Sequence, residues 1–113
     1  MQTNQILEEG ILKINISGEL DASSAIDMDD VMKDAFQKGH FLILINCSDL
    51  KYISSAGLGV FVSYLEDFKS RNGKFVFYRM NESVFSVFQI LGLDKIMTIV
   101  KDEQEAKKVV NEK

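Results

Sequence analysis

The sequence contains no proline and only one cysteine, Cys47, among its 113 residues. A single cysteine excludes an intrachain disulfide and a metal site built from several thiols. The absence of proline fits a compact chain with short connections and argues against a linker. Nothing near Cys47 in the sequence clearly lowers the pKa of its thiol, so we expect a buried or half-buried structural thiol.

The sequence also lacks any apolar run of about 18 residues, the length at which a membrane-spanning helix is considered. The first residues, MQTNQILEEG, have neither the basic nor the apolar region of a signal peptide. These two absences predict a cytoplasmic protein that has no membrane partner.

Positive charge is scarce. Lys and Arg together number 13 against 17 Asp and Glu, which gives a net charge of −4. Because neutralisation of phosphates drives most nucleic-acid affinity, no nucleic-acid partner is expected. The chain length and the ordinary share of apolar residues, 46%, predict one domain over residues 1–113.

The first half of the chain changes from a strand period to a helical one. Leu12, Ile14 and Ile16 alternate with polar residues, as in a half-buried strand, and residues 3–8 are expected to pair with it through an EEG turn. A helix should follow and stop at Gly39. Its apolar stripe is expected to consist of either Ile26 or Met28 together with Val31, Met32, Ala35 and Phe36.

The second half continues the alternation. The apolar run 41–46 predicts a central parallel strand, and residues 47–53 are interpreted as a connection. A helix is predicted from Ser55 to the RNGK segment, then a strand over 75–80. Residues 81–93, with Asn81 as cap, should form a short helix that is buried nearly all round. A strand over 95–100 and a polar helix close the chain.

This order, β-β-α-β-α-β-α-β-α, predicts an α/β fold with a mostly parallel sheet, sequential strand order and right-handed βαβ crossovers. In such folds the carboxyl ends of parallel strands and the amino ends of helices share one edge, where binding sites gather. Residues 18–21, 46–55 and 81–83 should meet there. Asp21 and Ser55 are therefore expected to be neighbours.

The segment KYISSAGLGVF (51–61) lies at that edge. Ser54 or Ser55 could simply cap the helix that follows. Gly57 and Gly59, however, each cost up to ~1 kcal/mol in a first turn, and they would leave the start of the helix bare for another surface. A hydroxyl at a helix amino terminus is also well placed for phosphorylation.

The segments SGELD (17–21) and LILINCSDLKYISSAGLGVFVSYL (42–65) are similar to the anti-sigma factor antagonist family, the bacterial STAS domains. The resemblance covers essentially the whole chain. Members typically carry Asp-Ser-Ser-Gly-Leu, whose first serine accepts phosphate. Aligning Gly57 and Leu58 places that acceptor at Ser55, with Ser54 at the aspartate position as a rival acceptor. Asp21 matches the acid that closes the strand-to-helix loop.

The resemblance implies a phosphorylation-controlled binding module. Its unphosphorylated form would bind an anti-sigma factor that is also a serine kinase and so release a sigma factor. Phosphorylation would end the binding, and a PP2C-type phosphatase would restore it. The expected partner-binding residues are Asp21, Ser54, Ser55, Ala56, Gly57, Leu58 and Gly59. A monomer or weak dimer without cofactor or metal is expected. The alternative is a STAS subunit of a stress-signalling scaffold or a lipid-transport complex.

The sequence lacks the catalytic residues that the candidate enzyme classes would need. Serine hydrolysis needs a base beside the nucleophile, and the only histidine, His40, precedes the third predicted strand at the opposite edge. The sequence has neither a Gly-x-Ser-x-Gly elbow nor a phosphate-binding Gly-Lys-Ser/Thr loop. A receiver-like domain would need an aspartate at the end of that strand, where Asn46 and Cys47 stand. We expect a protein that is not an enzyme.

Overall fold

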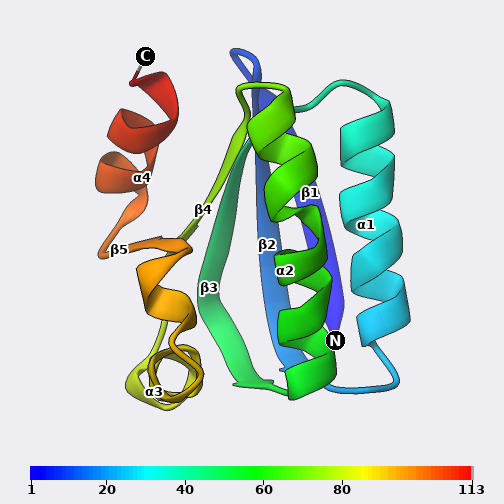
Figure 1. The fold of residues 1–113 in the computed structure, drawn as a ribbon, viewed down its shortest axis with the longest axis vertical. Coiled ribbons are helices and arrows are strands. Elements are labelled where there is room, and N and C mark those ends of the chain that lie inside the picture. Colours follow the sequence, from blue (N-terminus) through cyan, green and yellow to red (C-terminus); the bar gives the residue numbers. More distant parts are fainter. Residues whose placement is uncertain (113) are drawn as a thin grey trace.

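The computed structural model describes residues 1–112. Within these residues, one five-stranded sheet is accompanied by four α-helices and a short 3-10 helix (Figure 1). The elements are β1 Gln2–Glu8, β2 Ile11–Leu20, α1 Ala25–Gln37, β3 Leu42–Ile53, α2 Ser55–Ser70, β4 Lys74–Tyr78, α3 Glu82–Ile90, η1 Leu93–Lys95, β5 Thr98–Val100 and α4 Glu103–Asn111.

The strands stand in the order β1-β2-β3-β4-β5. β1 pairs with β2 antiparallel, and every later pairing is parallel. Glu9 and Gly10 connect the first two strands with positive φ angles of 51° and 81°. Two such residues form the kind of tight turn that matches the twist of a hairpin. The predicted α/β class, the sequential strand order and the EEG turn are confirmed.

The sheet has a different covering on each face. Helices α1 and α2 lie side by side over one face (Figure 1), and most of the buried side chains belong to that side. Helix α4 packs on the other face over β3 and β4. The smaller cluster there consists of Ile11, Leu44, Val76, Tyr78, Ala106 and Val110. Covering on both faces explains why β3 and β4 read as continuous apolar runs.

The prediction of a connection over residues 47–53 is wrong. Strand β3 extends to Ile53, and its outer half pairs with the outer half of β2, for example Ser17 with Asp49. Cys47, Leu50 and Ile53 are buried, whereas the polar residues between them are exposed. Irregularities in the register of β2 against β3 break the simple alternation that identifies a strand in a sequence.

The structure also decides three further points about α1, α3 and β5. Met28 lies in the core while Ile26 is 70% exposed, which settles the choice left open for α1. The burial predicted for the helix over 81–93 is wrong, because Ile90 and Leu91 are 81% and 52% exposed. The last strand has only three residues, because within its predicted span Lys95 belongs to η1 and residues 96–97 form a turn and a bend.

Two predicted helix ends are confirmed. Asn81 caps α3 by accepting a hydrogen bond from the Val84 N–H, and Gly39 follows α1 with a φ of 81°. Along the described chain, no helix combines the length and apolar character needed to cross a membrane.

Candidate functional site

The ends of β2 and β3 bring two predicted site segments together. Leu20, the last residue of β2, is in register with Ile53, the last residue of β3. The Ser54 N–H then donates a hydrogen bond of 2.8 Å to the Leu20 carbonyl. Asp21 and Ser54 are therefore the first residues after the paired ends of β2 and β3, at the lower edge of the sheet in Figure 1. Asn81 joins the same edge by donating through Nδ2 to the Leu50 carbonyl at 3.0 Å.

The two serines have different environments. Ser54 has extended backbone angles and is the N-cap of α2; its Oγ accepts a hydrogen bond of 3.2 Å from the Gly57 N–H. Ser55 is the first residue of the helix and is exposed. Among the described residues, the Ser55 hydroxyl has no hydrogen-bond partner, so it is accessible to solvent and to another protein.

The glycines after the serines also differ. Gly57 is buried, and a Cβ added there would lie 2.6 Å from Leu20 Cγ, so this glycine lets α2 approach β2 closely. Leu58 is buried in the core. A Cβ at Gly59 would meet no atom within 4 Å. The expectation that both glycines leave the helix start bare therefore holds for Gly59 alone.

A shallow groove runs beside Ser55 between α1 and α2. It has a volume of about 380 Å³ and is lined by Ala25, Ile26, Asp29, Ala56, Gly59, Val60 and Ser63. Ile26, on its rim, is the exposed apolar residue of α1. Sequence reasoning offered Ile26 only as a core residue. The helical period could have separated the two, because Met28, Met32 and Ala35 share one face and position 26 does not.

Asp21 shapes its own loop. Its Oδ1 accepts hydrogen bonds from the Ser23 hydroxyl at 2.7 Å and from the Ser23 and Ser24 N–H groups at 3.0 Å. These bonds, led by that of the Ser23 hydroxyl, lower the pKa of Asp21 to about 2. The ionised carboxylate thus holds the start of α1 beside the Ser54 segment.

Other reactive groups lie apart from this edge. Burial raises the pKa of the Cys47 thiol to about 12, so it does not act as a thiolate nucleophile. His40 lies between α1 and β3, at the end of the sheet away from Ser55. Arg79 follows β4 with a φ of 55° and is exposed. Within residues 1–112, no group of three His, Cys, Asp or Glu side chains is arranged to hold a metal ion.

Comparison with known proteins gives consistent results in sequence and in structure. A family model described as STAS domain matches residues 4–106. The anti-sigma-B factor antagonist of Listeria monocytogenes is 29% identical over 94 residues, which cover 83% of this chain and 82% of the relative. The protein of the same name from Staphylococcus aureus is 24% identical over 92 residues, or 81% of this chain and 85% of the relative.

Among solved structures, a putative anti-sigma factor antagonist from Thermotoga maritima superimposes with a TM-score of 0.90 at 27% identity, covering 97% of this chain and 95% of the other. The anti-sigma factor antagonist SpoIIAA in its unphosphorylated form gives 0.80 at 21% identity, with 96% of each chain covered. The phosphorylated form of Bacillus SpoIIAA superimposes with a TM-score of 0.71 at 21% identity, covering 96% of this chain and 99% of the other. At that identity the SpoIIAA matches show the shared fold.

Proposed function

The chain belongs to the STAS domain family, and from that membership we propose that it is an anti-sigma factor antagonist controlled by phosphorylation of Ser55. The unphosphorylated form binds an anti-sigma factor that is also a serine kinase, and a sigma factor is released. Phosphorylation ends the binding, and a PP2C-type phosphatase restores it. This exchange takes place in the cytoplasm, and the protein acts as one domain over residues 1–113, a monomer or weak dimer that binds without catalysing a reaction.

The difference between the two serines is the observation that carries this proposal. The Ser54 hydroxyl is half-buried and occupied as the cap of α2, whereas the Ser55 hydroxyl is exposed and has no partner among the described residues. A kinase needs the oxygen that it phosphorylates to be accessible. Ser55 is therefore the acceptor that the geometry favours, although Ser54 stands where the family carries an aspartate.

The amino terminus of α2 can accept a phosphate without refolding. The N–H groups of a first helical turn and the helix dipole stabilise an anion placed there. The first turn of α2 contains no acidic residue that would repel the phosphate. The domain should therefore keep its structure when Ser55 is modified, so that the change acts on binding.

The partner is expected to dock over the exposed residues Ser55, Ala56 and Gly59 and over the groove with Ile26 at its rim. Gly57 and Leu58 support this surface from beneath, since both are buried. A phosphate adds about −1.5 to −2 charges. Within a desolvated interface of small and apolar residues, such a charge costs about 2–5 kcal/mol, which weakens binding by more than ~30-fold.

The test uses the cognate kinase with ATP and locates the phosphate by mass spectrometry. Wild type and Ser54→Asn should be modified at residue 55, because asparagine keeps the cap of α2 while removing the rival hydroxyl. Ser55→Ala should remain unmodified. A phosphate that persists in Ser55→Ala would refute the assignment.

Binding to the kinase provides the second readout. Ser55→Asp should bind more than ~30-fold more weakly than wild type while its thermal unfolding stays unchanged. Ile26→Asn should also weaken binding, since it removes the apolar side chain at the groove. The alternative role, as a STAS subunit of a stress-signalling scaffold or a lipid-transport complex, predicts that no sigma factor is released when the unmodified protein is added.

A further inference from the structure

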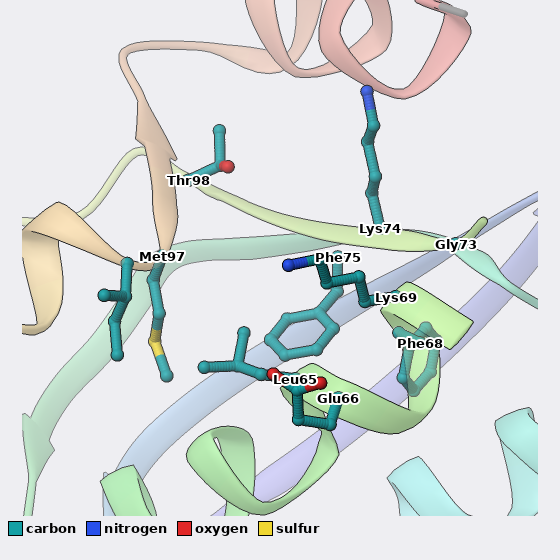
Figure 2. Close-up of a pocket in the computed structure, with 10 residues that line it drawn as sticks. Leu65, Glu66, Phe68, Lys69, Gly73, Lys74, Phe75, Met97 and Thr98 are labelled. Atoms are coloured by element: carbon teal, nitrogen blue, oxygen red, sulfur yellow. The ribbon is translucent and has the colours of Figure 1, made fainter. Parts of the chain in front are cut away.

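A larger cavity lies at the opposite end of α2 from Ser55. Its volume is about 450 Å³, within the range of small-molecule sites. It lies between the last two turns of α2 and the strands β4 and β5 (Figure 2). The residues that line it are Leu65, Glu66, Phe68, Lys69, Gly73, Lys74, Phe75, Ile96, Met97 and Thr98.

The topology leaves this space open. β5 has only three residues, and α3 packs against β3 rather than against β5. The wall is nevertheless rigid, because Phe68, Phe75 and Met97 belong to the main core and the rings of Phe68 and Phe75 lie 5.2 Å apart. Ile96, which is 58% exposed, forms the outer rim. Phe68, Phe75 and Met97 are themselves only 1%, 6% and 5% exposed, so a ligand would meet their exposed edges and, mainly, the side chain of Ile96.

Two opposite charges stand on the helical side of the cavity. Figure 2 shows Glu66 and Lys69 on α2, beside Phe75 and across from Met97. Among the described residues, neither charge takes part in an ion pair. Lys74 points to the other face of the sheet, where its Nζ donates to the Val109 carbonyl at 3.2 Å.

We propose that this cavity binds a free apolar α-amino acid. Its side chain would pack against Ile96 and the exposed edges of Phe75 and Met97, its carboxylate would pair with Lys69 and its ammonium group with Glu66. One acid and one base beside an apolar wall are complementary to a zwitterion with an apolar side chain, and each exposed charge pair adds modest affinity. The site is independent of Ser55 and of the proposed switch.

The probe is L-phenylalanine, with L-leucine as an aliphatic counterpart, added to the ¹⁵N-labelled full chain and followed by NMR. We expect saturable shifts at the amides of Lys69, Phe75 and Met97 with a dissociation constant on the order of 1 mM, as is typical for so small a ligand. 3-Phenylpropanoate, which lacks the ammonium group, and phenethylamine, which lacks the carboxylate, should each bind about fivefold more weakly.

The variants separate this site from non-specific binding. Lys69→Gln and Glu66→Gln should each weaken L-phenylalanine binding about fivefold. Ile96→Ser should weaken all three aromatic probes, and Lys108→Gln, a matched charge change on α4, should leave every affinity unchanged. The proposal fails if the shifts do not saturate at ligand concentrations well above the expected dissociation constant, or if they map to amides away from this cavity. It also fails if phenethylamine or 3-phenylpropanoate binds as tightly as L-phenylalanine.

Discussion

At the scale of single residues, neighbouring serines acquire different roles from the point at which a strand ends. β3 runs to Ile53 and α2 begins at Ser55, which leaves one residue, Ser54, to cap the helix. The sequence alone offered either serine as the cap. It could not choose between them because residues 47–53 resemble a loop in composition, so the end of the strand was not visible.

The carboxylate of Asp21 provides a prediction at this scale. In an NMR titration, its pKa should lie near 2, well below the ordinary value of 3.8. Because folding lowers this pKa, the ionised carboxylate stabilises the folded state fully above about pH 4, and this contribution is lost as the pH falls toward 2. Ser23→Ala should raise the pKa, since the Ser23 hydroxyl bond is its largest cause.

A matched control comes from Ser63→Ala. The Ser63 hydroxyl donates to the Val60 carbonyl within α2 and is not among the groups that shift the pKa of Asp21, so this pKa should not change. If Asp21 titrates near 3.8 in the wild-type protein, the hydrogen bonds that Ser23 and Ser24 donate to its Oδ1 do not persist in solution.

At the scale of elements, the sequence predicted well wherever periodicity and end signals agreed. The β1–β2 hairpin, the stop of α1 at Gly39 and the Asn81 cap all have local causes, namely turn residues and side-chain acceptors. The outer half of β3 was missed because its identity is not local: it exists through pairing with β2, and irregular register hides its period. Tertiary pairing of this kind overrides local composition.

Helix α3 shows the opposite failure. Its apolar composition predicted burial all round, yet only Val84 and Phe88 are buried. Burial depends on the surface that neighbouring elements offer, and the short β5 offers little to Ile90 and Leu91. The proposed docking surface was missed in part for a similar reason, since the exposure of Ile26 follows from how α1 is rotated on the sheet.

The packing of α2 on β2 gives a prediction for Gly57. Gly57→Ala would place a methyl group 2.6 Å from Leu20 Cγ, so the helix must shift away from the strand. The free energy of unfolding in urea should fall by about 1–3 kcal/mol. Gly59→Ala is the matched control: its methyl group meets nothing within 4 Å, and the free energy should rise by up to ~1 kcal/mol. Equal effects at both positions would contradict this packing.

At the scale of the whole molecule, the two faces of the sheet differ in how many helices cover them and in how many side chains they bury. One face carries two long helices and a large core. Among residues 1–112, α4 is the one helix that covers the other face, and of its residues Ala106 and Val110 are buried. Polar contacts add to this docking: the Tyr78 hydroxyl donates to Glu103 at 3.1 Å. Burial raises the pKa of Tyr78 from 10 to about 12, so its hydroxyl remains a donor well above neutral pH.

This inequality predicts that α4 opens before the rest of the molecule. In native-state hydrogen exchange, the amides of α4 should exchange through a local opening that leaves β2 and β3 protected. Val110→Ala removes buried methyl groups from the smaller cluster and should cost about 1–2 kcal/mol, which accelerates exchange in α4 roughly tenfold. Lys108→Ala, an exposed change on the same helix, should have little effect. If the amides of α4 and β3 exchange at one common rate in the wild-type protein and also in Val110→Ala, α4 unfolds only with the whole molecule. The two faces of the sheet would then form a single cooperative unit.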